Sequence, residues 1–309
     1  MSSFRWAVTG TPCVKAFSDL QGQLGWLGHG HSGNTSNNLS ANLRLLGTTS
    51  NKSMFAEVIG ALQTLMIRHS KAQRISGDVA LKLPDLECET VWLTMDGAEK
   101  RDYAVAHDTD RLSWANAVTD GVTSWTATLR LRRKLAYCST SDRKLQALVG
   151  DLNSLRQKEP HMHVVVFTQS VAAHKRICQS VQRAGFTVYD ISGGSNIKQR
   201  HQSIRDFQKA ESKPKVFVLT MKTGNCGITL TAATRVYLME PCIDPAHEQQ
   251  AAGRIHRLGQ LKDVMCKRFC LRDTYEEQVV ELHTQLKSGK ASLTDGRLSG
   301  QLFQLLTRK

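Results

Sequence analysis

Residues 216–220 read Val-Phe-Val-Leu-Thr, a short apolar run between Lys-Pro-Lys and a loop that contains two glycines. A run of this length is too short for a helix and is typical of a strand buried on both faces of a parallel sheet. Similar runs occupy residues 163–167, 188–191 and 235–239, and helical patterns cover residues 171–184 and 197–209. Because strands and helices alternate across residues 140–287, the sequence predicts an α/β domain with a parallel sheet and helices on both faces.

The loop after this run, residues 221–231, combines glycines with hydroxyl side chains. It reads Met-Lys-Thr-Gly-Asn-Cys-Gly-Ile-Thr-Leu-Thr. Gly224 and Gly227 would let the backbone amides approach a phosphate closely, which a side chain at either position would hinder. The loop is therefore a candidate phosphate-binding segment.

A second polar segment, residues 249–260, reads Gln-Gln-Ala-Ala-Gly-Arg-Ile-His-Arg-Leu-Gly-Gln. Asp244 and Pro245 are typical of the start of a helix, at whose end the two arginines would lie. Arg254 and Arg257 are three residues apart and would share one helix face. Each guanidinium group can bind two phosphate oxygens at once. We therefore expect the two arginine side chains to bind one polyanion. A solvated basic surface is the alternative.

The order of these segments resembles the second RecA-like lobe of Swi/Snf-type DNA translocases, in helicase superfamily 2. Thr168-Gln169 resembles motif IV, residues 220–231 resemble motif V, and residues 250–260 resemble motif VI. Within this family the likeness is closest to the SHPRH-type branch, because of Glu240-Pro241 and of residues 245–248 before motif VI. The resemblance implies that Arg254 and Arg257 are catalytic arginine fingers.

The resemblance also implies the other roles at the site. Nucleotide contacts would come from Gly224, Gly227 and Gln250. Phosphates of DNA would be bound by Thr168, Gln169, Ser192, Gly193, Thr220, Lys222 and Thr223. Since such contacts carry no sequence information, we expect binding to duplex DNA that ignores base sequence and weakens with salt. Asn225 and Thr229 depart from the usual form of motif V, whereas Arg254 and Arg257 match motif VI.

The N-terminal part carries a shorter resemblance. Residues 5–12 resemble motif III, which closes the first lobe of these enzymes, and Thr9, Gly10 and Thr11 would couple the two lobes. We expect residues 1–30 to be the end of the first RecA-like lobe, residues 31–139 a loop, linker and helical region, residues 140–287 the second lobe with a brace helix, and residues 288–309 a tail. The part before the second lobe would be a mainly helical remnant of the first.

The sequence contains no GxxxxGK[ST] phosphate loop and no acidic box for magnesium. In this family both belong to the first lobe, so we expect ATP and Mg²⁺ to bind only when a complete first lobe is present, and this chain not to hydrolyse ATP alone. Two explanations stay open, a fragment of a longer translocase or a short protein that has lost hydrolysis. The apolar strand predicted at residues 4–9 favours the first, because an unpaired strand is prone to aggregation.

The net charge is +14, from 41 Lys and Arg against 27 Asp and Glu, which predicts an anionic partner such as nucleic acid. No apolar run is long enough to span a membrane. The eight cysteines form no CxxC pair, so we expect no zinc site, and the RING of SHPRH-type proteins has no counterpart between residues 83 and 164. Scattered cysteines are typical of a reducing intracellular compartment, and the family implies the nucleus.

Three functions stay open at this point. The first is the C-terminal lobe of an ATP-dependent DNA translocase in chromatin remodelling or DNA repair, with nucleosomes or histones as further partners. The second is a DNA-binding module that does not hydrolyse ATP, and the third is a protein-docking module derived from such an enzyme.

Overall fold

The computed structural model describes ten ranges of the chain, which are residues 5–7, 20–27, 52–67, 74–75, 78–79, 82–104, 137–191, 196–210, 213–224 and 227–289. Of the predicted site residues, Thr9, Gly10, Thr11, Ser192 and Gly193 lie outside these ranges. The chain divides into two compact units that meet between Leu81 and Lys82. The second unit contains the predicted second lobe.

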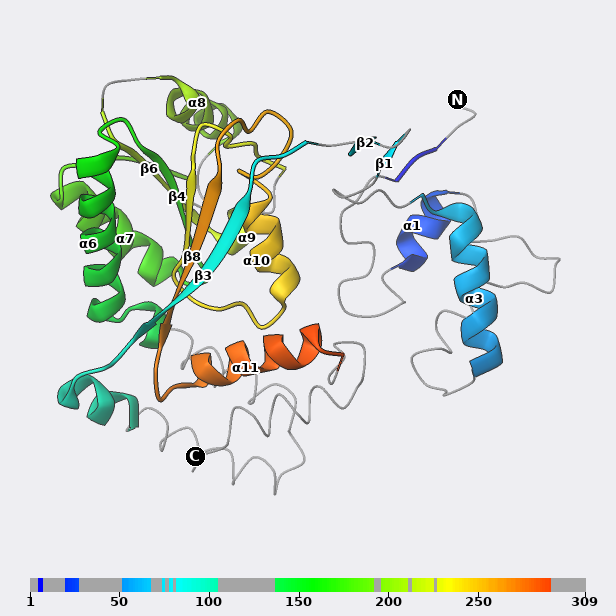
Figure 1. Cartoon of the computed structure of the whole chain (residues 1–309), viewed down its shortest axis with the longest axis horizontal. Helices are drawn as coiled ribbons and strands as arrows, with labels where there is room; N and C mark the ends of the chain where they lie inside the picture. Colours follow the sequence, from blue (N-terminus) through cyan, green and yellow to red (C-terminus); the bar gives the residue numbers. More distant parts are fainter. Residues whose placement is uncertain are drawn as a thin grey trace. The chain divides into compact units, whose positions relative to one another are not determined.

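Six parallel strands form the sheet of this second unit (Figure 1). Their order across the sheet is β3-β8-β7-β4-β6-β5, and every neighbouring pair is parallel. The strands span β3 Leu86–Leu93, β4 His163–Thr168, β5 Thr187–Ile191, β6 Lys215–Thr220, β7 Arg235–Leu238 and β8 Val264–Leu271. Because the strands share one direction, the loops that follow them gather at one edge of the sheet and the loops that precede them gather at the other.

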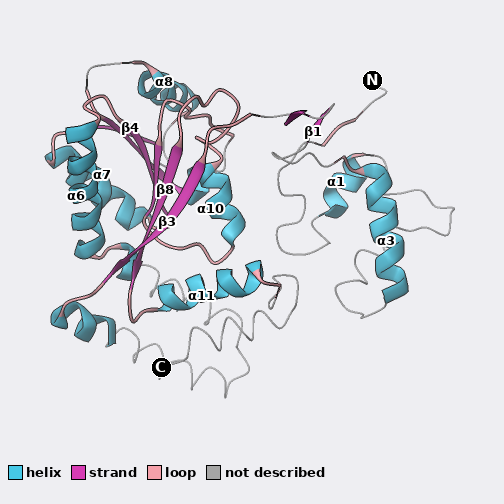
Figure 2. Ribbon diagram, in the orientation of Figure 1, coloured by secondary structure: helices cyan, strands magenta, loops and turns pink. Residues whose placement is uncertain are grey.

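Helices cover both faces of this sheet (Figure 2). Helices α6 (Asp142–Lys158) and α7 (Val171–Arg183) pack on one face, and α8 (Ile197–Gln208) and α10 (Pro245–Ala252) pack on the other. Successive residues of a strand point to opposite faces, so Val164 and Val166 of β4 face α6 and α7 while Val165 and Phe167 face the other layer. The prediction of a RecA-like parallel sheet with helices on both faces is confirmed.

The sheet is wider than the range of residues 140–287 from which we expected it. Strand β3 lies in the region assigned to the linker, and β8 was not predicted at all. Both strands carry charged residues within their length, so neither shows the uninterrupted apolar run of a central strand. Lys267 of β8 is held by Asp151 of α6 at 3.0 Å, which explains how a charged residue is accommodated there.

The smaller unit, up to Leu81, is mainly helical in its described residues. Helices α1 (Leu20–Trp26) and α3 (Lys52–Leu65) pack through Leu20, Leu24, Val58 and Leu62. Val58 and Leu62 lie on the buried face of α3. Strands β1 (Arg74–Ile75) and β2 (Asp78–Val79) form a short antiparallel pair.

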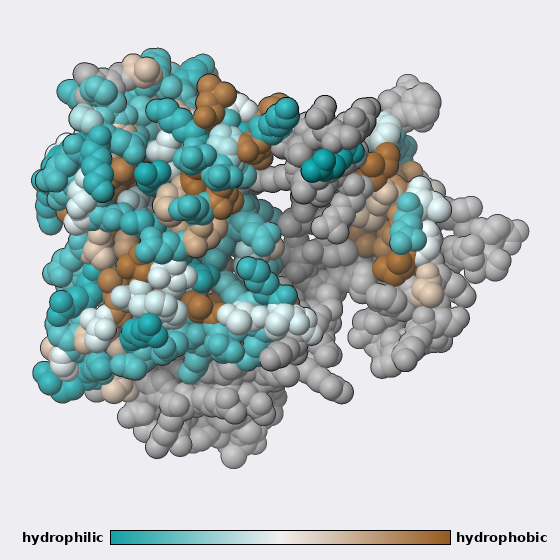
Figure 3. Space-filling view, in the orientation of Figure 1, coloured by the Kyte–Doolittle hydropathy of each residue, from teal (hydrophilic) through white to brown (hydrophobic). Residues whose placement is uncertain are grey.

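Hydrophilic residues cover most of the face of residues 82–289 that Figure 3 shows, and apolar side chains lie among them in small groups. No helix within the described ranges combines the length and the apolar character that a membrane span requires.

Candidate functional site

The carboxyl edge of the sheet holds the predicted motif IV. Thr168 ends β4 with no exposed surface, and its hydroxyl donates to Glu240 Oε1 at 2.7 Å. The backbone N–H of Gln169 donates to the second oxygen of Glu240 at 2.8 Å, and its side-chain amide donates to the Pro241 carbonyl at 2.9 Å. Thr168 was predicted to contact DNA, and in this structure its buried hydroxyl holds Glu240 in place. Gln169 is half-buried. Both residues stay predicted contacts.

The first half of motif V lies at the same edge, directly after β6. Helix α9 (Met221–Gly224) is a single turn that Thr220 caps, since its hydroxyl accepts from Thr223 N at 3.2 Å. The hydroxyls of Thr220 and Thr223 also lie 3.0 Å apart and bond to each other. Lys222 is exposed between them. Of these three predicted DNA contacts, Lys222 is the charged one, and its side chain is exposed to solvent.

Gly224 was predicted to let the backbone approach a nucleotide, but the structure gives this glycine a packing role. A Cβ atom at Gly224 would lie 2.5 Å from Cε1 of Phe167, well inside the contact distance. The ring of Phe167 therefore occupies the space that a side chain would need. Gly227 differs, because its φ of +60° favours glycine and its surroundings are open. Gly227 stays a predicted nucleotide contact.

This packing gives a first testable prediction. Gly224→Ala should lower the free energy of unfolding by about 1–3 kcal/mol, because the added methyl overpacks the core against Phe167. The midpoint of urea denaturation measures the change. The matched control is Gly150→Ala in α6, where nothing lies within 4 Å of the new Cβ and a small gain of roughly 0.5–1 kcal/mol is expected. Equal effects of the two substitutions would contradict the packing role.

The predicted motif VI follows α10. Asp244 caps this helix by accepting from Ala246 N at 2.8 Å, and Pro245 occupies its first turn, both as expected. However, α10 ends at Ala252, and the two arginines lie in the turns that follow. The prediction that Arg254 and Arg257 share a helix face is therefore wrong, and the turns position them instead. Gln250 is half-buried within α10.

Hydrogen bonds join motif VI to the second half of motif V and to the residues that follow it. Arg257 Nη1 donates to the hydroxyl of Thr229 at 3.0 Å, and Leu230 N donates to the carbonyl of Arg254 at 2.9 Å. The side-chain amide of Gln260 donates to the carbonyl of Ala233 at 2.8 Å and also to that of Thr231 at 3.1 Å. Thr229, one of the two departures from the usual motif V, thus holds one of the two arginines.

The predicted site residues gather at opposite edges of the sheet. Thr168, Gln169 and residues 220–224 follow strands and lie at the carboxyl edge. Residues 228–233 precede β7 and residues 254–260 precede β8, so they lie at the amino edge. His256 extends this second group, because its Nε2 donates to the carbonyl of Pro84 before β3 at 2.7 Å. Motif V runs from one edge to the other and connects the two groups of residues.

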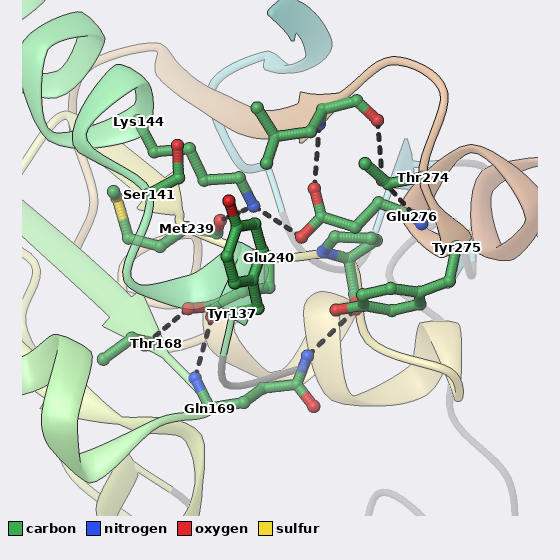
Figure 4. A network of polar contacts seen from close by, with 12 residues as sticks. Tyr137, Ser141, Lys144, Thr168, Gln169, Met239, Glu240, Thr274, Tyr275 and Glu276 are labelled. Carbon is green, nitrogen blue, oxygen red and sulfur yellow. Dashed lines mark hydrogen bonds and ion pairs between the residues drawn. The ribbon is translucent and has the colours of Figure 1, made fainter. Parts of the chain in front are cut away.

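A buried ionic cluster at the carboxyl edge was not predicted. The ammonium group of Lys144 in α6 donates to Glu276 Oε1 at 2.5 Å and to the Met239 carbonyl at 2.7 Å, and both charged side chains are fully buried (Figure 4). Glu276 belongs to α11 (Tyr275–Lys287) and also accepts from Leu271 N at 2.8 Å. The cluster joins α6, β7, β8 and α11, so it fixes α11 to the lobe.

Glu240 is the second carboxylate near Lys144, so one ammonium serves two carboxylates. Burial raises the pKa of Glu240, while Lys144 and the hydrogen bond from Thr168 act in the opposite direction. Desolvation lowers the pKa of Lys144, but Glu276 and Glu240 outweigh it, and the pKa is raised. Lys144 therefore stays charged in the interior and is needed to stabilise the carboxylates.

Residues 143–259 match the family described as helicase conserved C-terminal domain. A SWI/SNF-related matrix-associated actin-dependent regulator of chromatin (subfamily A member 3-like 1) from Arabidopsis thaliana is 38% identical over 154 residues, which are 50% of this chain and 18% of that protein. The Homo sapiens helicase-like transcription factor is 35% identical over 147 residues, or 47% of this chain and 15% of that protein. Residues 143–259 form a helicase C-terminal domain, and the relatives of this stretch include SWI/SNF-related proteins. The chain as a whole spans less than a fifth of the length of these two relatives.

A solved structure shares the fold of this lobe. The Sulfolobus solfataricus SWI2/SNF2 ATPase core, solved in complex with dsDNA, superposes with a TM-score of 0.55 at 20% identity. The match covers 85% of this chain and 55% of that one. At this identity the likeness establishes the fold.

The sequence did not predict the roles of Lys144, Glu240 and Glu276 in the lobe. Thr274 caps α11 by accepting from Glu276 N at 3.2 Å, and the side chain of Glu276 is fully buried. One signal was present, because Glu276 shares the helix face of the buried Val279 and Leu282. Among the described residues no group of three or more His, Cys, Asp or Glu is placed to hold a metal ion.

Proposed function

We propose that this chain supplies the C-terminal motor lobe of an ATP-dependent DNA translocase that acts in chromatin remodelling or DNA repair. The observation that carries the proposal is the contact between motifs V and VI, in which Arg257 binds Thr229 and the backbone of Arg254 binds Leu230. One continuous loop thereby joins the candidate arginine fingers to the candidate DNA-binding edge. Such a loop could transmit a change at the nucleotide to a change at the DNA.

Arg254 and Arg257 would meet the terminal phosphates of an ATP molecule that a first lobe holds. Both side chains are half-buried at the amino edge, where a guanidinium can pair with phosphate oxygens in a site of reduced dielectric. Gly227, with its left-handed backbone, and Gln250 would add nucleotide contacts. ATP supplies the driving reaction, and Mg²⁺ would be held by the first lobe, since motif V and motif VI contain no carboxylate. Hydrolysis by this chain alone is not expected.

Duplex DNA is the proposed partner, with nucleosomes or histones as further ones and the nucleus as the compartment. The relatives' names place them in chromatin regulation and transcription, and a structural neighbour was solved with dsDNA. Lys222, Thr223 and Gln169 at the carboxyl edge would bind the phosphates of one strand, with Thr220 ordering α9 and Ser192 and Gly193 adding backbone contacts. These groups offer charge and hydrogen bonds to phosphate rather than to base edges.

Binding to duplex DNA tests this proposal directly. Fluorescence anisotropy with two duplexes of unrelated sequence should give the same affinity, and log Kobs should fall linearly with log salt concentration, by about 0.9 in slope for each phosphate neutralised. An affinity that is independent of salt, or that differs strongly between the two sequences, would contradict phosphate recognition.

Lys222 gives the sharper form of the same test. Lys222→Gln should reduce the salt slope by about 0.9, because one charge contact is lost. Lys158→Gln makes the same change of charge at the exposed end of α6, at the opposite edge of the sheet, and should leave the slope nearly unchanged. If both variants reduce the slope equally, the chain binds DNA through its general charge of +14 and not through the carboxyl edge.

A further inference from the structure

Two cysteines that are distant in the sequence are register partners in the sheet. Cys88 of β3 pairs with Cys266 of β8, so their side chains project from the same face of adjacent parallel strands. Neighbouring strands lie about 4.8 Å apart, which falls inside the window of roughly 4.4–6.8 Å between Cα atoms that a disulfide bond accepts. The register therefore places the two thiols beside each other, at a Cα separation compatible with a covalent bond.

The two thiols differ in accessibility and in acidity. Cys88 is exposed on the edge strand, whereas Cys266 is 5% exposed. The hydrogen bond from Cys266 lowers the pKa of Cys88 to about 7, with help from Arg268 and Lys287 and against burial and Glu248. The same hydrogen bond and burial raise the pKa of Cys266 well above its ordinary value. Cys88 is therefore suited to attack a reagent from solvent, and Cys266 is suited to follow.

The remaining cysteines in the described part of the chain lack this combination. Cys138, Cys242 and Cys270 are buried, and Cys178 is half-buried in α7, where desolvation raises its pKa to about 12. A thiol without thiolate character reacts slowly with disulfides. Among the cysteines that the structure describes, the reactivity that we infer is thus specific to the register pair, which no CxxC spacing in the sequence could reveal.

We propose that Cys88 and Cys266 form a redox-responsive dithiol that low-molecular-weight disulfides of the glutathione class oxidise. The Cys88 thiolate attacks one sulfur of the reagent, forms a mixed disulfide and releases one glutathione thiolate. Cys266 then loses its proton to solvent and attacks the Cys88 sulfur, which forms the protein disulfide and releases the second glutathione thiolate. The two protein thiols lose two electrons and two protons in total, and the reagent is reduced to two thiols.

The disulfide would fasten the edge strand β3 to β8. Strand β3 begins four residues after Lys82, where the second compact unit begins, and Arg268 beside the pair already binds Thr90 of β3 at 2.8 Å and Glu248 of α10 at 2.8 Å. The bond would therefore lock the first strand of the lobe to the layer that carries α10 and motif VI. It does not require the proposed translocase function.

Peptide mass spectrometry tests the proposal in the full chain. The protein is incubated with oxidised and reduced glutathione at a series of ratios, quenched in acid, alkylated and digested with trypsin. Cys88 falls in the peptide of residues 83–100 and Cys266 in that of residues 263–267, while Cys270 falls in a separate peptide. Wild type should yield the cross-linked pair of these first two peptides, with the loss of two hydrogens. The Cys178→Ser control should behave like wild type.

Substitutions of Cys266 separate the two roles that it is given. Cys266→Ser should accumulate glutathione on Cys88, because the resolving thiol is lost, and should keep the low pKa of Cys88, because a hydroxyl still donates. Cys266→Ala should lose both the resolving thiol and the low pKa of Cys88, because alanine has neither a thiol nor a donor. The rate of Cys88 alkylation should be half-maximal near pH 7 in wild type and in Cys266→Ser, and at a pH about one to two units higher in Cys266→Ala.

The gain in rate is modest and can be estimated. At pH 7 about half of Cys88 is thiolate, against roughly 3% for an ordinary cysteine, but the lower basicity reduces its nucleophilicity about fivefold. The net advantage over Cys266→Ala is about threefold. The proposal is overturned if wild-type protein stops at the mixed disulfide on Cys88, or if its alkylation profile matches that of Cys266→Ala.

Discussion

Lys144→Ala should lower the free energy of unfolding of the lobe by about 3–5 kcal/mol. The substitution removes the ammonium that binds Glu276 at 2.5 Å and leaves two buried carboxylates, Glu276 and Glu240, without it. Domains of this kind are stable by only about 5–15 kcal/mol, so the loss is a large fraction of the total. Urea denaturation followed by circular dichroism measures it.

Two comparisons make the Lys144 experiment specific. Lys158→Ala removes a lysine from an exposed position of the same helix and should change stability by less than about 0.5 kcal/mol. The double variant Lys144→Met with Glu276→Gln should recover part of the loss, because it removes the ion pair as a whole. A single variant as stable as the Lys158 control would show that the buried pair does not hold α11 to the lobe.

Arg257→Ala should reduce the kcat of DNA-stimulated ATP hydrolysis by about 10³–10⁵ in a protein that contains both lobes. Without the guanidinium, the charge that develops on the transferred phosphoryl group loses its partner from this lobe. Arg254→Ala should have a loss of the same order. Lysine should not restore the rate at either position, because it lacks the planar fork that binds two phosphate oxygens.

The assay for the arginines uses a chimera in which residues 82–289 replace the second lobe of an active Swi/Snf-type ATPase. Arg183→Ala is the matched control, since Arg183 is exposed at the end of α7 on the opposite face of the sheet. It removes the same charge and should leave kcat within about twofold of the parent chimera. Arginine variants that hydrolyse ATP at the rate of the parent would remove Arg254 and Arg257 from the catalytic role.

The parts of the fold that were predictable are those whose cause lies within one segment. Apart from their terminal residues, β4, β6 and β7 are apolar because both faces of these strands are covered, and their loops begin where the pattern predicts. Strand β8 was missed because Lys267 and Arg268 interrupt its apolar pattern. Their ion-pair partners, Asp151 and Glu248, lie in α6 and α10, far away in the sequence. Such compensation is invisible in a local window of sequence.

In the candidate site, too, some features could be predicted from one segment and others depend on distant contacts. Residue identity and order predicted Arg254 and Arg257, but the end of α10 at Ala252 and the bond from Arg257 to Thr229 depend on packing between motifs. Gly224 was expected to let the backbone approach a phosphate, because glycine often has this role in loops. Its packing against the ring of Phe167 can be seen only in the structure. The pairing of Cys88 with Cys266 likewise depends on the register of two strands that are distant in the chain.

The central claim is that this lobe works with a first lobe that holds ATP, and mapping the 5′ end of the native transcript tests it most directly. Translation upstream of the codon for Met1 should reveal, in the same reading frame, a GxxxxGK[ST] loop followed by an acidic magnesium box. The arginine variants can then be measured in the native protein. A transcript that encodes neither feature would contradict the account, because Arg254 and Arg257 would have no bound nucleotide to act on.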